Sequence, residues 1–173
     1  IRGSSLRREN FLATVKTCIK KELEVILDVD VRWSSTHFMI ERALVLREAI
    51  RRFLSMDDFQ DLLRYSLLPD EWTLLELMNE VLEIPHAFQQ QLSAEKRPTL
   101  CDALPSFAAM TSLWEEMKVR HPVLVPAIKA GLEKLSDYVH CTLEVPAYVL
   151  SMGMCIFCPP YLTDIFSQLS IRT

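Results

Sequence analysis

Two cysteines near the C-terminus have the spacing of half a zinc site. Cys155 and Cys158 are separated by two residues, and His140 with Cys141 could complete a set of four ligands. A single pair of this kind, without a second spaced pair, is more often incidental, and the five cysteines are irregularly spaced. We therefore expect no zinc site and no disulfide framework, as in a reducing compartment.

Two carboxylates lie two residues apart on a β-branched stretch. On a strand, Asp28 and Asp30 would point to the same face, as a Mg²⁺-binding pair requires. We favour the alternative, a solvent-facing row on a half-buried strand. Three glycines are too few for a glycine-rich phosphate loop, and the four histidines lie on different predicted elements. Side-chain chemistry alone therefore names no function.

Basic side chains are concentrated at the N-terminus. The first 21 residues hold six of them against Glu9 alone, although the whole chain has a net charge of −4. Such an arm could contact DNA phosphates or an acidic partner. The alternative, which we favour on residue pattern alone, is a solvated helix face. The candidate DNA contacts are Arg2, Arg7, Arg8, Lys16, Lys20 and Lys21.

The spacing of apolar residues predicts a mainly α protein. Half of the 173 residues are hydrophobic, and so few glycines disfavour turn-rich β architectures. Apolar residues three and four apart predict helices over residues 6–21, 36–53, 69–85, 99–117 and 125–139. Pro85 is expected to end or kink its helix. The exception is Leu23–Val31, whose β-branched residues predict the one strand.

Length and hydropathy argue against a two-domain, membrane-spanning or secreted protein. The chain is long enough for one domain with a core and too short for two ordinary ones. No apolar run approaches the roughly 20 residues that span a bilayer, and no apolar segment follows the N-terminal arginines as in a secretory signal. We expect no membrane and no small-molecule substrate among its partners.

The stretch from residue 27 to residue 44 resembles a family signature. It reads LDVDVRWSST and, two residues later, MIERAL, which resembles the D-V-x-x-R-W-[NS]-S-T and M-L-x-R-A-L signature of hAT transposases. Downstream, Trp72 is similar to the W-x-x-L position of the family, and KRPTL at residues 96–100 to its [KR]-x-P-T-L segment. The resemblance runs from about residue 1 to residue 151 and is closest to fungal members. The motif residues, to which we assign a structural role, are Arg32, Trp33, Ser34, Ser35 and Thr36.

This resemblance implies a split RNase H-like fold with a long helical insertion. In the family, two Asp and one Glu hold two Mg²⁺ ions for strand cleavage and transfer. Both Asp lie upstream of the motif, where this sequence has only Asp28 and Asp30, which belong to the motif itself. Residues 151–158, SMGMCIFC, stand where the family has a block that precedes the Glu. We therefore expect no catalytic residue, no enzyme activity and no cofactor, although an intact member would use Mg²⁺.

The expected fold is a helical bundle with one residual strand of the split RNase H-like fold. Residues 1–36 are the expected remnant of the RNase H-like core, residues 37–150 the helical insertion domain, and residues 151–173 a divergent, poorly ordered tail. A lone strand leaves its backbone groups unpaired at both edges. We expect it to be marginal, exposed or paired with another chain.

Two functions remain open at this point. The first is a non-catalytic fragment of a hAT-family DNA transposase that retains weak DNA contact through the basic arm. Because the family acts on chromosomal DNA, this function implies the nucleus. The second is a helical module recruited for protein interaction, with a related transposase chain among its candidate partners. A working nuclease is disfavoured because the metal ligands are missing.

Overall fold

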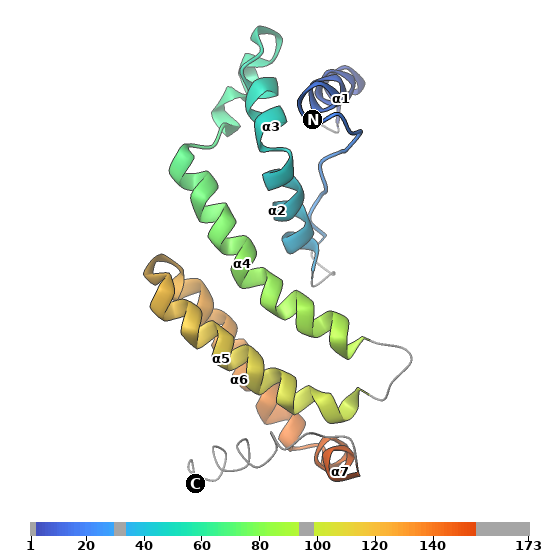
Figure 1. Ribbon diagram of the computed structural model, residues 1–173, viewed down its shortest axis with the longest axis vertical. Coiled ribbons are helices and arrows are strands. Elements are labelled where there is room, and N and C mark those ends of the chain that lie inside the picture. Colours follow the sequence, from blue (N-terminus) through green and yellow to red (C-terminus); the bar gives the residue numbers. More distant parts are fainter. Residues whose placement is uncertain (1–2, 30–33, 94–98, 155–173) are drawn as a thin grey trace. The chain divides into compact units, whose positions relative to one another are not determined.

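The described part of the chain is mainly helical. The computed structural model describes residues 3–29, 34–93 and 99–154, and within them every regular element is a helix (Figure 1). The chain divides into two compact units, Ile1–Leu82 and Glu83–Thr173. No helix in the described residues is both long and apolar enough to cross a membrane. The domain boundary predicted at residue 36 stays a prediction.

The first unit contains α1 to α3, a 3-10 helix and most of α4. The bounds are α1 Ser5–Ile19, α2 Ser35–Val45, α3 Arg47–Leu54, η1 Asp57–Tyr65 and α4 Pro69–Leu92. The second unit contains the end of α4 and the helices that follow. Their bounds are η2 Leu100–Asp102, α5 Ala103–Arg120, η3 Pro122–Leu124, α6 Val125–Leu143 and α7 Pro146–Met154.

Helix α1 has a defined start and a defined end. The Ser4 hydroxyl accepts a hydrogen bond from the Arg7 N–H at 3.5 Å, which caps the first turn. At the other end Lys20 adopts the left-handed conformation, with φ 54°, and its N–H donates to the Lys16 carbonyl at 3.1 Å. This is the helix termination that glycine usually provides, so a lysine there bears conformational strain.

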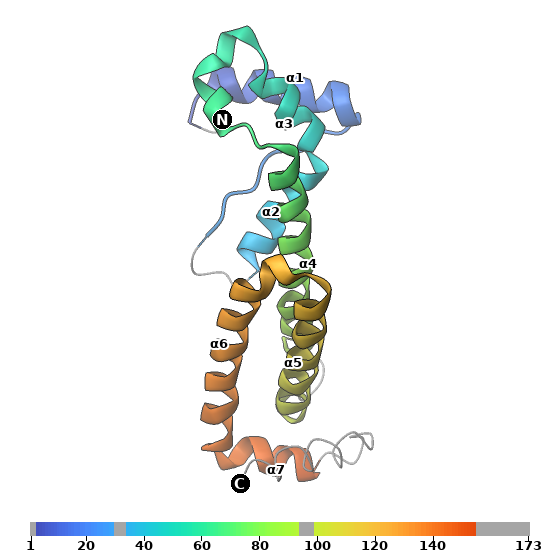
Figure 2. The same cartoon turned by 90° about the vertical axis from the view of Figure 1, so that its left-hand side faces the viewer.

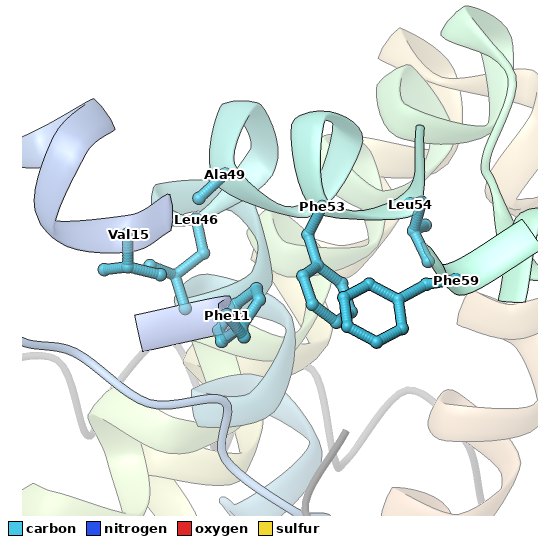
Figure 3. Close-up of a cluster of buried hydrophobic side chains, with 7 residues drawn as sticks. All are labelled: Phe11, Val15, Leu46, Ala49, Phe53, Leu54 and Phe59. Atoms are coloured by element: carbon cyan, nitrogen blue, oxygen red, sulfur yellow. The ribbon is translucent and has the colours of Figure 1, made fainter. Parts of the chain in front are cut away.

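The core of the first unit is aromatic and connects helices distant in sequence (Figure 3). Phe53 of α3 is fully buried between two other rings. It meets Phe11 of α1 edge-on at a centroid distance of 5.4 Å and stacks on Phe59 of η1 at 4.7 Å. Both arrangements are favoured by the ring quadrupoles. Val15 and Leu46 complete this contact between α1 and α3, so α1 is part of the core rather than a free arm.

The single helix predicted over residues 36–53 is divided at Leu46. This residue has φ −92° and ψ 5°, outside the helical region, and separates α2 from α3. The hydrogen bonds continue across the break, because Leu46 donates to the Arg42 carbonyl and accepts from the Ile50 N–H. The predicted apolar stripe is retained, and Leu46 itself is fully buried.

The predicted strand is wrong for the part that the structure describes. Residues 23–29 form no strand, and the last two predicted positions lie outside the described residues. Side chains bond the backbone groups at its two ends instead: the Glu24 carbonyl accepts from Arg42 Nη1 at 2.9 Å, and the Val29 N–H donates to Ser35 Oγ at 2.7 Å. High β propensity makes a strand only beside a second strand, and the described residues contain none.

The second unit is built on the contact between α5 and α6, which lie side by side (Figure 2). Trp114 of α5 is buried against Gly131 of α6, and the turn at residues 121–124 joins the two helices. Met152 of α7 packs with Cys101 and Leu104. Helix α4 continues through Pro85, so the predicted end of that helix is wrong. Residues 155–173, the greater part of the predicted tail, lie outside the described residues.

Candidate functional site

The candidate DNA contacts lie on α1 and directly after it, while Arg2 lies outside the described residues. Two arginines of this set are held by acidic side chains of the same unit. Arg7 Nη2 lies 2.7 Å from Asp61 Oδ2 of η1, and Arg8 Nη2 lies 2.5 Å from Glu24 Oε1, which also accepts from Arg8 Nε. The hydrogen bond and the charge of Glu24 raise the pKa of Arg8 above its ordinary value. Both guanidinium groups are therefore already paired with a carboxylate.

The three lysines of the set differ from one another. Lys16 Nζ lies 3.0 Å from Glu22 Oε1 in an exposed pair. Lys20 and Lys21 are exposed, and within the described part of the chain neither has an acidic partner. Because these two residues follow the last turn of α1, the free positive charge is concentrated at that end of the helix.

No local sequence pattern predicts the acids that pair with Arg7 and Arg8. Asp61 is 54 positions from Arg7, and Glu24 is 16 positions from Arg8, so neither follows a helical spacing. The Arg7–Asp61 pair forms because α1 packs against α3 and η1 follows α3 directly, and the Arg8–Glu24 pair forms because the segment after α1 runs back along that helix.

The family motif forms a hydrogen-bonded cluster at the N-terminus of α2. Thr36 Oγ1 donates to Asp28 Oδ2 at 2.9 Å, and the Val29 N–H donates to Asp28 Oδ1 at 2.9 Å and to Ser35 Oγ at 2.7 Å. The hydrogen bond from Thr36, followed by that from Ser35, lowers the pKa of Asp28. A carboxylate at a helix N-terminus also interacts favourably with the helix dipole. The cluster fixes the extended segment against the start of α2.

The other motif residues are placed as follows. Ser34 occupies the N-cap position of α2, while Arg32 and Trp33 lie outside the described residues, as does Asp30. In this geometry the Asp28 carboxylate is occupied by hydroxyl and backbone donors.

Metal-ligand chemistry has no counterpart in the described residues. Within residues 3–29, 34–93 and 99–154, no three His, Cys, Asp or Glu side chains are grouped so that they could hold a metal ion. Cys155 and Cys158 lie outside those ranges, and Cys141 is a free, exposed thiol on α6.

A comparison with known protein families finds a match that covers the first unit. Residues 1–81 match the ZBED1 RNase-like helical domain. This is a region related to the hAT transposases, and the matched span ends one residue before the first unit does. The predicted relation to the hAT transposases is thereby confirmed for residues 1–81.

A fungal protein is similar over nearly the whole chain. "Putative transcriptional regulator tpeD" of Talaromyces stipitatus is 27% identical over 167 residues, which cover 96% of this chain. The chain spans only 17% of the length of that relative. No solved structure matches.

Proposed function

We propose that this chain is a non-catalytic helical part of a transposase-derived protein of hAT type, and that it contacts DNA weakly through the end of α1. The match over residues 1–81 supports the family origin. One observation supports the weakness of the contact: Arg7, Arg8 and Lys16 are paired with acids, while Lys20 and Lys21 are not. A protein acting on chromosomal DNA would work in the nucleus.

The number of free cations sets the salt dependence of this contact. Each neutralised phosphate of a duplex contributes about −0.9 to the slope of log K against log salt, so two lysines predict a slope of about −2. Raising salt from about 50 to about 200 mM should then weaken binding about 10-fold, against about 500-fold if all five described basic residues contacted phosphates. The slope therefore distinguishes a contact by two lysines from a contact by the whole arm.

Fluorescence anisotropy with a labelled duplex of about 20 base pairs, at several salt concentrations, would measure this slope. Removal of residues 1–21 is unsuitable as a test, because Phe11 and Val15 belong to the core. Lys20→Gly is the better variant: it removes one free charge, and glycine fits the left-handed conformation at this position. Lys129→Ala on α6, also exposed, is the matched control.

We expect Lys20→Gly to weaken binding and reduce the slope by about 0.9 without loss of thermal stability, while Lys129→Ala changes neither. Equal binding by Lys20→Gly and the control would contradict contact at the end of α1. Absence of binding by the unmodified chain at low salt would remove the DNA role and favour the second candidate.

The second candidate is a helical module for protein interaction, and the extended segment after α1 favours it. Leu27 and Val29 are 58% and 41% exposed, and residues 25–28 make no backbone–backbone hydrogen bond with any described residue. An exposed apolar segment whose backbone is not engaged by a neighbouring strand can accept a strand from a partner, which adds main-chain hydrogen bonds. A related transposase chain is the partner we would test first.

A further inference from the structure

Acidic residues from three different places in the first unit contact the basic side chains of α1. Asp61 lies on η1, Glu24 lies in the extended segment, and Glu22 lies just after α1. They contact, in that order, Arg7, Arg8 and Lys16, which are three of the five described candidate DNA contacts. All three pairs are at least partly exposed to solvent.

We propose that Asp61, Glu24 and Glu22 form an acidic mask that restrains DNA binding by α1. This inference rests on the proposed DNA contact of α1 and adds its regulation. Each acid occupies N–H donors that a phosphate would need, and its own negative charge repels an approaching duplex. In the masked state Lys20 and Lys21 are the only described candidates that face the phosphates without a competing acid.

The acidic mask is reversible because its ion pairs are weak. Partly exposed ion pairs of this kind contribute about 0–1 kcal/mol each, so a polyanion or an acid-binding partner can displace them. The pairs are not needed to hold α1 in place, because Phe11 and Val15 anchor that helix in the core. Removing the acids should therefore release the basic side chains without unfolding the unit.

Other charges near α1 do not form part of the mask. Glu9 lies on α1 and is exposed. The arginines of α3, Arg51 and Arg52, are paired with Glu48 of the same helix. These pairs follow the spacing of a single helix and involve none of the basic side chains of α1.

The test compares two triple variants of the full chain with the same change in net charge. The mask variant is Glu22→Gln, Glu24→Gln and Asp61→Asn. The control is Glu41→Gln, Glu116→Gln and Glu133→Gln, three exposed acids that form no ion pair with a described residue. Both lose three negative charges, but only the mask variant frees the basic side chains of α1. The probe is the labelled random-sequence duplex, and circular dichroism verifies that each variant is folded.

We expect the mask variant to bind at least about 10-fold more tightly than the control at low salt, and its slope to steepen from about −2 to about −4.5 as three more cations reach phosphates. Equal affinity and slope for the two variants would overturn the mask and leave the proposed function standing. Binding by neither variant nor the unmodified chain would overturn both. If the mask variant is unfolded, Asp61→Asn and Glu24→Gln are tested singly, each with an expected steepening of about 0.9. An unchanged slope in both would overturn the mask.

Discussion

Gly131 of α6 lies where any side chain would meet the indole ring of Trp114. A Cβ atom at this position would lie 2.9 Å from both Cη2 and Cζ3 of that ring, closer than real Cβ contacts occur. Trp114 is only 7% exposed, so moving its ring away disturbs other packed groups. The substitution Gly131→Ala therefore forces α5 and α6 apart or moves the ring from its position.

Two effects of opposite sign determine the size of this change. Overpacking by one methyl group in a well-packed contact costs about 1–3 kcal/mol. Replacing glycine by alanine inside a helix returns about 1 kcal/mol through helix propensity. We therefore expect a net loss of about 1 kcal/mol in the free energy of unfolding of the second unit.

Urea denaturation followed by far-UV circular dichroism would measure the loss. The matched control is Gly153→Ala on α7, where nothing lies within 4 Å of an added Cβ. This control keeps part of the propensity gain without the clash, so it should be neutral or stabilising. A double-mutant cycle with Trp114→Leu, which removes the clashing ring atoms, should turn Gly131→Ala from destabilising to neutral or stabilising.

Equal stability of Gly131→Ala and Gly153→Ala would refute the clash. Additive effects of the changes at Gly131 and Trp114 would also refute it, because additivity would mean that the cost of the added methyl group does not arise from the ring.

Two further predictions concern the extended segment and its attachment to α2. Hydrogen bonds from Thr36 and Ser35 lower the pKa of Asp28 in the folded chain. The stabilisation is therefore present above the unfolded pKa of about 3.9 and is lost as pH falls through the lower folded value. Asp28→Asn should remove this loss of stability at acid pH, which thermal melts between about pH 2 and pH 7 would detect. A variant that loses stability at acid pH as the unmodified chain does would contradict the assignment of this loss to Asp28. Leu27→Pro should leave stability within about 0.5 kcal/mol, because the site is exposed and extended, yet abolish capture of a purified related transposase chain if the segment accepts a strand. Unimpaired capture would exclude strand addition.

The helices were predictable because their signal is local. Phe11 and Val15 in α1, and Ile128 and Leu135 in α6, recur at the spacing of a helix face and are buried as expected. The motif from residue 27 to residue 36 was equally readable, and residues 1–81 match a domain related to the same family. Of the two outcomes predicted for Pro85, an end or a kink, the end is wrong, because a long helix can tolerate one missing hydrogen bond that local rules treat as a stop.

The strand and the charge state of the basic arm were decided by tertiary structure. Leu23–Val29 has β-branched residues, but a strand exists only through its neighbours, and the described residues supply side-chain hydrogen bonds instead. Likewise six basic residues near the N-terminus predicted a positive arm, yet packing of α1 on α3 brings Asp61 against Arg7 across 54 positions. By itself the sequence determined which segments are helical and to which family the motif is similar. Only the tertiary structure determined which charges are free, because ion pairs between distant residues have no local sequence signal.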